Sequence, residues 1–260
     1  MLGKAAAYAE WRKEPPGIIP DFDDIDPKAA RNICLNALQQ RGPGWLSAQE
    51  SRDVLSAIRL PVPEGGVATS PEQAISIAEA LGYPVAVKLA SHELVHKTEV
   101  GGVCLNLQNA EEVRAAFLNI RKRLQRKGKL PAMEGVVIQP MISEGIEVMV
   151  GVADDPLFGP LIAFGLGGIH VEILGDVCFR VNPLTDKDAA QMVRQIRGYR
   201  LFEGYRGHRA ADTPAVENVL LRVSRLLEEV PEIGELDLNP IFLFPPGKGC
   251  LIADVRIRVK

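Results

Sequence analysis

The most informative segment of this sequence is GYPVAVKLASHELVHKTEVGGVCLNL, residues 82–107. It places Lys88 inside an apolar run, and a charge in a strand fit for burial is costly unless an anion meets it. A polar loop follows, in which Gly101 and Gly102 lack a Cβ, so their backbone N–H groups could approach a phosphate closely. Alternating apolar residues after the glycines predict a second strand. The order strand, loop, strand therefore predicts a polyphosphate-binding loop unlike a Walker loop, whose glycines lead into a helix.

The same stretch contains the pentapeptide HELVH, residues 92–96, which matches the HExxH pattern of zinc proteases. That pattern binds zinc only where a helix of several turns places both histidines on one face. Here the segment follows a strand directly and reaches the glycine pair within a few residues, which leaves room for little more than a turn or two of helix. A zinc hydrolase is therefore a remote alternative. His96, beside Lys97, is the better functional candidate, and His92 is expected to be a solvated loop residue.

The composition is that of an ordinary globular protein. Of 260 residues, 47% are hydrophobic and 24% are charged, which is enough to bury a core in one large or two small domains. No apolar run approaches the length of a membrane span, and residues 1–17 lack the apolar centre of a signal peptide, so we expect a cytoplasmic protein without a membrane partner. The net charge of −3 argues against nucleic acid as a partner. The four cysteines form no CxxC pair and are expected to be core thiols.

The chain divides into three regions. Residues 1–45 are rich in proline and aspartate, which predicts an extended linker with one short helix over residues 27–40. We infer that this region continues a longer polypeptide or docks on a partner. Residues 46–134 form a first α+β unit and residues 135–260 a second, strand-rich one. Two such units lying face to face predict a ligand cleft between them.

Local sequence patterns predict the helices and strands of both units. Each predicted helix opens at a capping residue, namely Ser47, Ser70, Asn109, Thr185 and Asp212. In the second unit, apolar or alternating runs predict strands over residues 136–139, 146–152, 161–164, 177–181, 236–244 and 250–255.

The second unit also contains a row of oxygen ligands. Glu235, Asp237 and Asn239 alternate with apolar residues, so a strand would point all three to one side. Asp254 lies inside the run LIADVRI, and pairing of the two strands would bring it opposite that row. Carboxylate and amide oxygens suit Mg²⁺, which takes one or two protein oxygens together with waters and nucleotide phosphates. The spacing alone leaves a solvated strand face as an equal alternative.

The combination of motifs resembles a known family. The runs YPVAVKLASHELVHKTEVGGV, VVIQPMISEGIEVMVGVADDPLFGPLIAFGLGG, FRVNPLT and ELDLNPI occur in the order found in the ATP-grasp domain of ADP-forming (NDP-forming) acyl-CoA synthetases, relatives of the β subunit of succinyl-CoA synthetase. The resemblance covers residues 46–257. It implies an ATP-grasp fold, an α+β (α/β) architecture whose two subdomains enclose a nucleotide cleft, with a phosphate loop in residues 46–134 and a Mg-binding hairpin in residues 135–260.

The same resemblance implies a function. The cofactors would be ATP/ADP and Mg²⁺, and the domain would pass a phosphoryl group between a phosphohistidine and ADP. In the whole enzyme, acyl-CoA, ADP and phosphate would become carboxylate, ATP and CoA. The implied partner is a CoA-binding/ligase domain or subunit of the same enzyme, to which residues 1–45 would be the linker.

Phosphate and catalytic contacts carry over by position. Lys88 matches a lysine that contacts nucleotide phosphates, and Lys97 with Gly101 and Gly102 matches the phosphate loop. His96 matches a histidine thought to relay the phosphoryl group. Asp237 falls where an acidic residue faces the incoming phosphohistidine.

Further positions match the rest of a nucleotide site. The adenine hinge would be Val137, Ile138 and Gln139. Glu147 would meet the sugar or the phosphates, while Asn239 and Asp254 match the Mg²⁺ ligands. Arg180 and Arg206 are candidate anion contacts, for which a surface role is equally open.

Two alternatives accompany this interpretation. A non-catalytic regulatory module of the same shape, as in domains fused to an acetyltransferase, would bind Mg·ATP weakly or not at all. The zinc hydrolase would be revealed by metal analysis.

Overall fold

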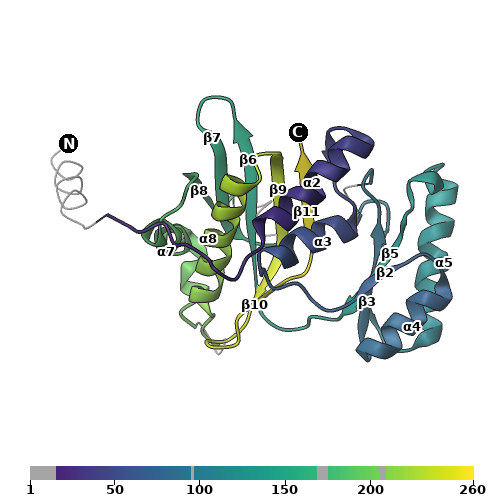
Figure 1. The fold of residues 1–260 in the computed structure, drawn as a ribbon. Coiled ribbons are helices and arrows are strands. Elements are labelled where there is room, and N and C mark those ends of the chain that lie inside the picture. Colours follow the sequence, from purple (N-terminus) through teal and green to yellow (C-terminus); the bar gives the residue numbers. More distant parts are fainter. Residues whose placement is uncertain (1–15, 95–96, 169–174, 205–208) are drawn as a thin grey trace.

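The computed structural model describes residues 16–94, 97–168, 175–204 and 209–260 (Figure 1). Within these residues the helices are α2 (Pro27–Arg41), α3 (Ala48–Ala57), α4 (Pro71–Leu81), α5 (Ala110–Arg126), α7 (Asp186–Gln195) and α8 (Thr213–Glu229). The strands are β1 (Gly44–Trp45), β2 (Gly66–Ala68), β3 (Val85–Ala90), β4 (Val103–Leu107), β5 (Gly135–Pro140), β6 (Ile146–Asp155), β7 (Gly159–Leu166), β8 (Val177–Val181), β9 (Ile233–Leu243), β10 (Cys250–Ile252) and β11 (Val255–Val259). All strand pairs are antiparallel, and the α+β class predicted from the sequence is confirmed.

The small lobe consists of the four-stranded sheet β2-β5-β3-β4 and the helices α4 and α5. Successive side chains of β3 point to opposite faces of the sheet. Val85, Val87 and Leu89 pack on the helices, whereas Ala86 and Lys88 face away from them. Both helices therefore cover one face of this sheet, at the right of Figure 1, and the other face is turned toward the rest of the molecule.

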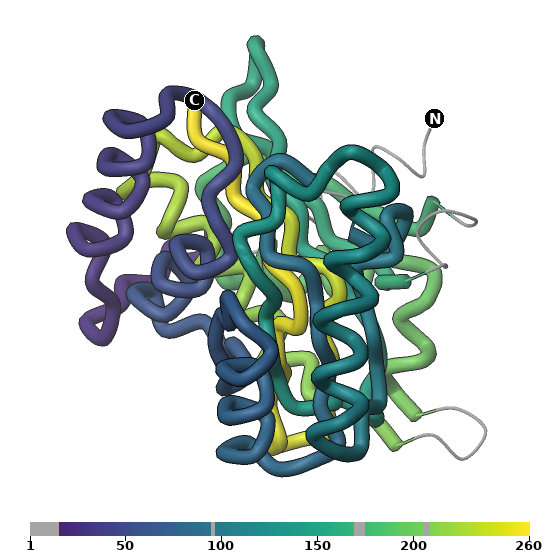
Figure 2. Tube along the Cα trace, turned by 90° about the vertical axis from the view of Figure 1, so that its right-hand side faces the viewer, coloured from purple at the N-terminus to yellow at the C-terminus, as the bar shows by residue number. Residues whose placement is uncertain are grey.

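The large lobe is built on the sheet β1-β11-β9-β6-β7-β8, with β10 paired to β9. Its core lies on one face of this sheet, where β6 contributes Val148, Val150 and Val152 and the helices α2, α3, α7 and α8 pack against them. The opposite face is turned toward the small lobe. Figure 2, seen from the small-lobe side, shows the yellow C-terminal strands running behind the small sheet.

The predicted helix caps form as expected, with one exception. Ser47 and Glu50 make a reciprocal capping box at α3, and Thr185 and Asp188 do so at α7. The side chains of Ser70 and Asn109 also each accept a backbone N–H from the first turn of α4 and α5. The Asp212 side chain makes no cap at α8 and instead accepts N–H groups from Gly247 and Gly249, at 2.8 and 2.9 Å. It therefore fixes the turn that joins β9 to β10.

Three sequence-based boundaries differ from the pairing in the structure. The region of residues 1–45 contains α2, whose Ala30, Cys34 and Ala37 are buried in the large-lobe core, and β1, which pairs with β11. Both α2 and β1 are therefore part of the large lobe and not of an extended linker. The split after residue 134 is also displaced, because β5 pairs with both β2 and β3 and so belongs to the small lobe.

The third difference concerns the last predicted strand. Residues 250–255 do not form one strand: β10 ends at Ile252 and β11 starts at Val255, so Ala253 and Asp254 lie in a break. The physical reason is Pro240, which lies opposite Ala253 and has no N–H to donate to Ala253 O. That carbonyl accepts instead from Lys88, and the Asp254 carboxylate accepts from Lys97. No helix among the described residues is long and apolar enough to cross a membrane.

Candidate nucleotide site between the lobes

A cleft of about 710 Å³ separates the uncovered faces of the two sheets. This volume is in the range of sites that hold a nucleotide-sized ligand. The small lobe, the segment that follows β5, and the large lobe all contribute to its walls. Six of the residues predicted from the sequence border it, namely Lys88, Lys97, Gln139, Glu147, Asn239 and Asp254.

Lys88 reaches from the small lobe to the large one. Its Nζ donates to Ala253 O at 2.8 Å. The Gln139 amide lies beside it, oriented so that Oε1 accepts from Lys88 Nζ at 3.1 Å and Nε2 donates to Ala253 O at 3.2 Å. Lys88 is partly buried, and its charge is held by oxygen atoms at the cleft floor.

Lys97 makes a second connection between the lobes. It is 8% exposed, and its Nζ forms an ion pair with Asp254 Oδ1 at 2.7 Å. Both partners border the cleft, so two lysines from the small lobe converge on the break between β10 and β11.

The charged groups of this cluster change one another's pKa. Burial lowers the pKa of Lys88, an effect that Lys97 and Arg52 increase and Asp254 opposes. Burial also acts to raise the pKa of Asp254, but attraction by Lys97 and Lys88 outweighs it and holds that pKa below its usual range. Asp254 therefore stays ionised at the cleft, and an ionised carboxylate is a ligand that Mg²⁺ accepts.

The predicted row of oxygen side chains lies on one face of β9, as its spacing predicts. Along β9, Leu236 and Leu238 are buried, whereas Glu235, Asp237 and Asn239 are partly exposed on the cleft face. Asn239 N donates to Asp254 O at 3.3 Å, which brings the two predicted Mg²⁺ ligands together. Both border the cleft, and carboxylate and amide oxygens are ligands that Mg²⁺ accepts.

The glycine pair acts differently from the expectation. Gly101 N donates to Thr98 O and Gly102 N donates to Lys97 O, at 2.9 and 2.7 Å, so both N–H groups close the loop and are not directed to a phosphate. Gly101 has φ +67°, and a Cβ on Gly102 would lie 2.8 Å from the Cβ of Leu89. Glycine is required there for the tight turn and the close approach. The loop residues that border the cleft are Lys97, Thr98 and Glu99.

The predicted hinge also needs a correction. Val137 and Ile138 lie in the middle of β5 with strand partners on both sides, so their backbone groups already serve the sheet. Gln139 borders the cleft, as do Pro140, Met141 and Ile142. A backbone contact to a base is therefore expected where the pairing ends, at residues 140–142, although Pro140 has no N–H and Met141 N already donates to Pro84 O.

Glu147 lies at the same end of the cleft. It is the first cleft-facing residue of β6 and pairs with Phe242 of β9, which also borders the cleft. Gly168, with φ +62°, lies so close that a Cβ there would be 2.6 Å from Glu147 Oε2. The glycine-rich end of β7 thus leaves room for this carboxylate.

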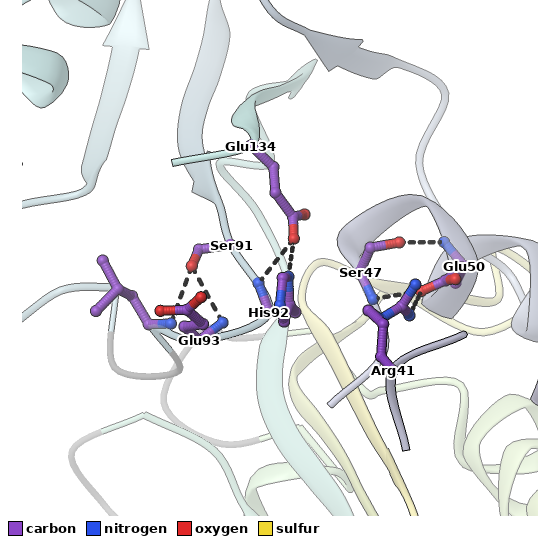
Figure 3. Close-up of polar contacts among 8 residues, drawn as sticks. Arg41, Ser47, Glu50, Ser91, His92, Glu93 and Glu134 are labelled. Atoms are coloured by element: carbon purple, nitrogen blue, oxygen red, sulfur yellow. Dashed lines mark hydrogen bonds and ion pairs between the residues drawn. The ribbon is translucent and has the colours of Figure 1, made fainter. Parts of the chain in front are cut away.

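The described part of the HExxH segment is not helical. His92 and Glu93 form a bend, and Ser91 Oγ accepts from the backbone N–H groups of Glu93 and Leu94 (Figure 3). The ring of His92 points to Glu134 and contacts its carboxylate. Among the described residues no cluster of three or more potential metal-ligating His, Cys, Asp or Glu side chains occurs. The precondition for a zinc protease motif is thus absent from this part of the segment.

Arg180 does not border the cleft. Arg180 lies on the edge strand β8, and its guanidinium donates to Phe179 O and to Gln195 of α7, which places it on the helix-covered face of the sheet. Its role as an anion contact is therefore not part of the candidate site. His96 and Arg206 lie outside the described residues.

Sequence reasoning missed several cleft residues. Arg256 borders the cleft, and its position two residues after Asp254 in LIADVRI could have indicated it, because such residues share a strand face. Thr98, Met141 and Phe242 carried no comparable signal, since they lie in loops or read as ordinary core residues.

Comparison with known proteins gives consistent results. The ATP-grasp domain family matches residues 36–259. The beta subunit of acetate–CoA ligase (ADP-forming) II from Pyrococcus furiosus is 42% identical over 212 residues, which cover 81% of this chain and 90% of that subunit. The 4-hydroxybutyrate–CoA ligase (ADP-forming) of Nitrosopumilus maritimus is 38% identical over 98% of this chain, which spans only 36% of that longer protein.

Solved structures show the same similarity. The dinucleotide forming acetyl-coenzyme A synthetase 1 of Ca. Korarchaeum cryptofilum, in complex with coenzyme A and Ca-AMPCP, superimposes with a TM-score of 0.83 at 37% identity, over 89% of this chain and all of that one. A second structure of that enzyme, with coenzyme A and Mg-AMPPCP, has a TM-score of 0.76 at 35% identity over the same shares, and its phosphohistidine segment points towards the nucleotide binding site.

Proposed function

Because this chain belongs to the ATP-grasp domain family, and within it to the group that contains the beta subunits of ADP-forming acetate–CoA ligases, we propose that it is the nucleotide-binding phosphotransfer part of an ADP-forming acyl-CoA ligase. The observation that carries this proposal is the convergence of Lys88 and Lys97 from one lobe with Asn239 and Asp254 from the other on a single cleft. Cations that neutralise a nucleotide's phosphates and oxygens that hold its metal have to border the same ligand, and these four residues do border one cleft.

The cleft residues divide into those for the base, the phosphates and the metal. Residues 140–142 and Glu147 lie at one end and would contact the base and the sugar. Lys88 and Lys97 would neutralise phosphate oxygens, and Asn239 and Asp254 would hold Mg²⁺. A bound Mg²⁺ would offset the charge on the phosphate oxygens and keep them in place.

Phosphoryl transfer needs positioning and charge neutralisation more than covalent help from the protein. In the direction of ATP formation, the N–P bond of a phosphohistidine breaks and its electron pair stays on the imidazole nitrogen. An oxygen lone pair of the ADP β-phosphate forms the new O–P bond. Lys88 and Lys97 hold the acceptor phosphates in line, and the desolvated floor of the cleft strengthens each contact.

Two further residues are proposed to act in the transfer between the phosphohistidine and the nucleotide. We retain His96 as the relay residue on the strength of its motif. Asp237, on the cleft face of β9 next to the metal ligands, would orient the imidazole that arrives there. The acyl-CoA chemistry would reside in a complementary CoA-binding portion, either fused to this chain or a separate subunit, since the relatives occur in both forms.

Calorimetric titration with Mg·ADP tests the nucleotide site. We expect the wild type to bind and Lys88→Met to bind about tenfold to a hundredfold more weakly, because a charge-assisted hydrogen bond contributes roughly 1.5–3 kcal/mol and each 1.4 kcal/mol is a factor of ten. Lys122→Met, on the exposed side of α5, is the matched control and should bind like the wild type. Equal affinities of the wild type and Lys88→Met would refute the assignment of Lys88. Absence of binding in the wild type would refute the phosphotransfer role and favour the regulatory alternative.

A further inference from the structure

Arg256 is a cationic residue of the cleft to which no role has yet been assigned. It lies on β11, two residues after Asp254, and pairs across the ladder with Asp237. Its neighbours Ile257 and Val259 face the large-lobe core, with Ile257 completely buried, so by alternation Arg256 faces the cleft. It borders both the cleft and a small adjoining recess that also contains His92 and Lys97.

The other cations on this face of the large sheet already have partners. Arg258, the next residue on the same side of β11, forms an ion pair with Glu235, and Lys260 contacts Asp154. The guanidinium of Arg256 makes no hydrogen bond or ion pair to another residue in the described part of the chain, although its charge acts on Asp254. A half-buried guanidinium has five N–H donors to satisfy, so a site bordered by Arg256 favours an anionic ligand.

The strand register orders the cleft residues along one line. Starting from the end where residues 140–142 lie, β9 presents Phe242 opposite Glu147, then Asn239 beside Asp254, and then Asp237 opposite Arg256. At about 3.4 Å per residue, Asp237 lies roughly 7 Å beyond Asn239. Arg256 therefore lies on the far side of the metal ligands from the segment assigned to the base.

We propose that Arg256 binds the phosphoryl group in transit, which is the terminal phosphate of the triphosphate. This inference rests on the proposed nucleotide site and adds to it the recognition of that one group. A guanidinium fits two phosphoryl oxygens at once, and the charge of a phosphoryl group in transfer is spread over its equatorial oxygens. Arg256 thus acts on the reacting group itself, whereas Lys88 and Lys97 act on the phosphates that precede it.

Two nucleotides distinguish this role from a general electrostatic one. Mg·ADP lacks the terminal phosphate, whereas Mg·AMPPNP, a non-hydrolysable triphosphate, supplies its equivalent. For Arg256→Gln we expect Mg·AMPPNP to bind about tenfold more weakly and Mg·ADP to bind within twofold of the wild type. Arg256→Lys keeps the charge but loses the two-point contact, so it should show a smaller loss in the same direction. Arg258→Gln, its paired neighbour on the same strand face, should change neither affinity.

The outcomes separate the two proposals. If the wild type binds neither nucleotide, the nucleotide site itself is wrong. If the wild type binds both and Arg256→Gln weakens both equally or neither, the site stands and the role of Arg256 is refuted. Thermal melting of each variant checks folding, and Arg256→Lys provides the same comparison of the two nucleotides should the glutamine variant be unstable.

Discussion

Asp254 is the residue at which the two lobes meet. Its carboxylate accepts from Lys97, its backbone carbonyl accepts from Asn239, and the preceding carbonyl accepts from Lys88. Attraction by the two lysines holds its pKa below the ordinary value of 3.8 despite its burial. Asp254 therefore contributes to the free energy of folding as well as to the proposed metal site.

The Asp254→Asn variant tests this contribution. Because the pKa of Asp254 is lower in the folded state, its stabilisation is present above pH 3.8 and is lost as the pH falls through the lower, folded-state value. At pH 7 we expect a loss of about 3 kcal/mol, the low end for a broken buried ion pair, because the Lys97 ammonium would remain buried without a counter-charge. Urea denaturation of both proteins at decreasing pH should show the difference shrinking below pH 4.

A surface ion pair provides the control for that experiment. Asp154 contacts Lys260, and both side chains are more than a third exposed. Asp154→Asn should therefore change the free energy of unfolding by less than about 1 kcal/mol at any pH. If Asp254→Asn lost no more free energy of unfolding than Asp154→Asn, or if its loss grew as the pH fell, the assigned role of Asp254 would be contradicted.

At the scale of single elements, the loop between β3 and β4 connects the sheet to the cleft. Its glycines close the turn, Arg123 of α5 donates to Gly101 O at 2.7 Å, and Leu89 of β3 donates its N–H to Gly102 O. The loop is thereby held against the sheet, and this fixes Lys97 in its position opposite Asp254.

Substitution of Gly102 distinguishes turn closure from phosphate binding. In Gly102→Ala the new Cβ would lie 2.8 Å from Leu89 Cβ and 3.0 Å from Lys97 O, so we expect a loss of about 2 kcal/mol in the free energy of unfolding, as for an overpacked core site. Gly44→Ala is the control: no atom lies within 4 Å of its added Cβ, and a change within about 0.5 kcal/mol is expected. Unaltered stability of Gly102→Ala together with lost nucleotide binding would instead favour a direct phosphate contact.

At the scale of the whole molecule, each lobe has its own hydrophobic core, and the cleft between them carries polar contacts. Such an arrangement keeps two rigid walls in place while it leaves charged groups available to a ligand. The proposed reaction also needs the complementary CoA-binding portion, because phosphoryl transfer from nucleotide to acyl group requires a carrier between them.

The relay assignment is tested in the combined enzyme. With the complementary portion and Mg·ATP labelled at the γ-phosphate, we expect acid-labile label on this chain, and we expect His96→Ala to abolish it because the acceptor nitrogen is removed. His92→Gln is the matched control, since His92 lies in the same segment but its ring contacts Glu134. Label that persists in His96→Ala, or turnover that is unchanged, would contradict the relay role.

Local signals in the sequence determined the elements and the faces on which they are buried. Caps such as Ser47 and Thr185 specify where helices begin through bonds within one turn, and the alternation in ELDLNP specifies one strand face because side-chain direction has a period of two. The charge of Lys88 in an apolar strand likewise indicated a site without reference to any partner.

Which of these groups come into contact depends on how the whole chain packs. The break at Ala253 and Asp254, the turn-closing role of Gly101 and Gly102, and the placement of Arg180 on the helix-covered face all depend on contacts between residues far apart in the chain. Such contacts follow from how the two sheets pair and pack, and no short-range pattern encodes them. The sequence thus specified the chemical groups of the cleft, and the packing of the lobes selected those that can act together.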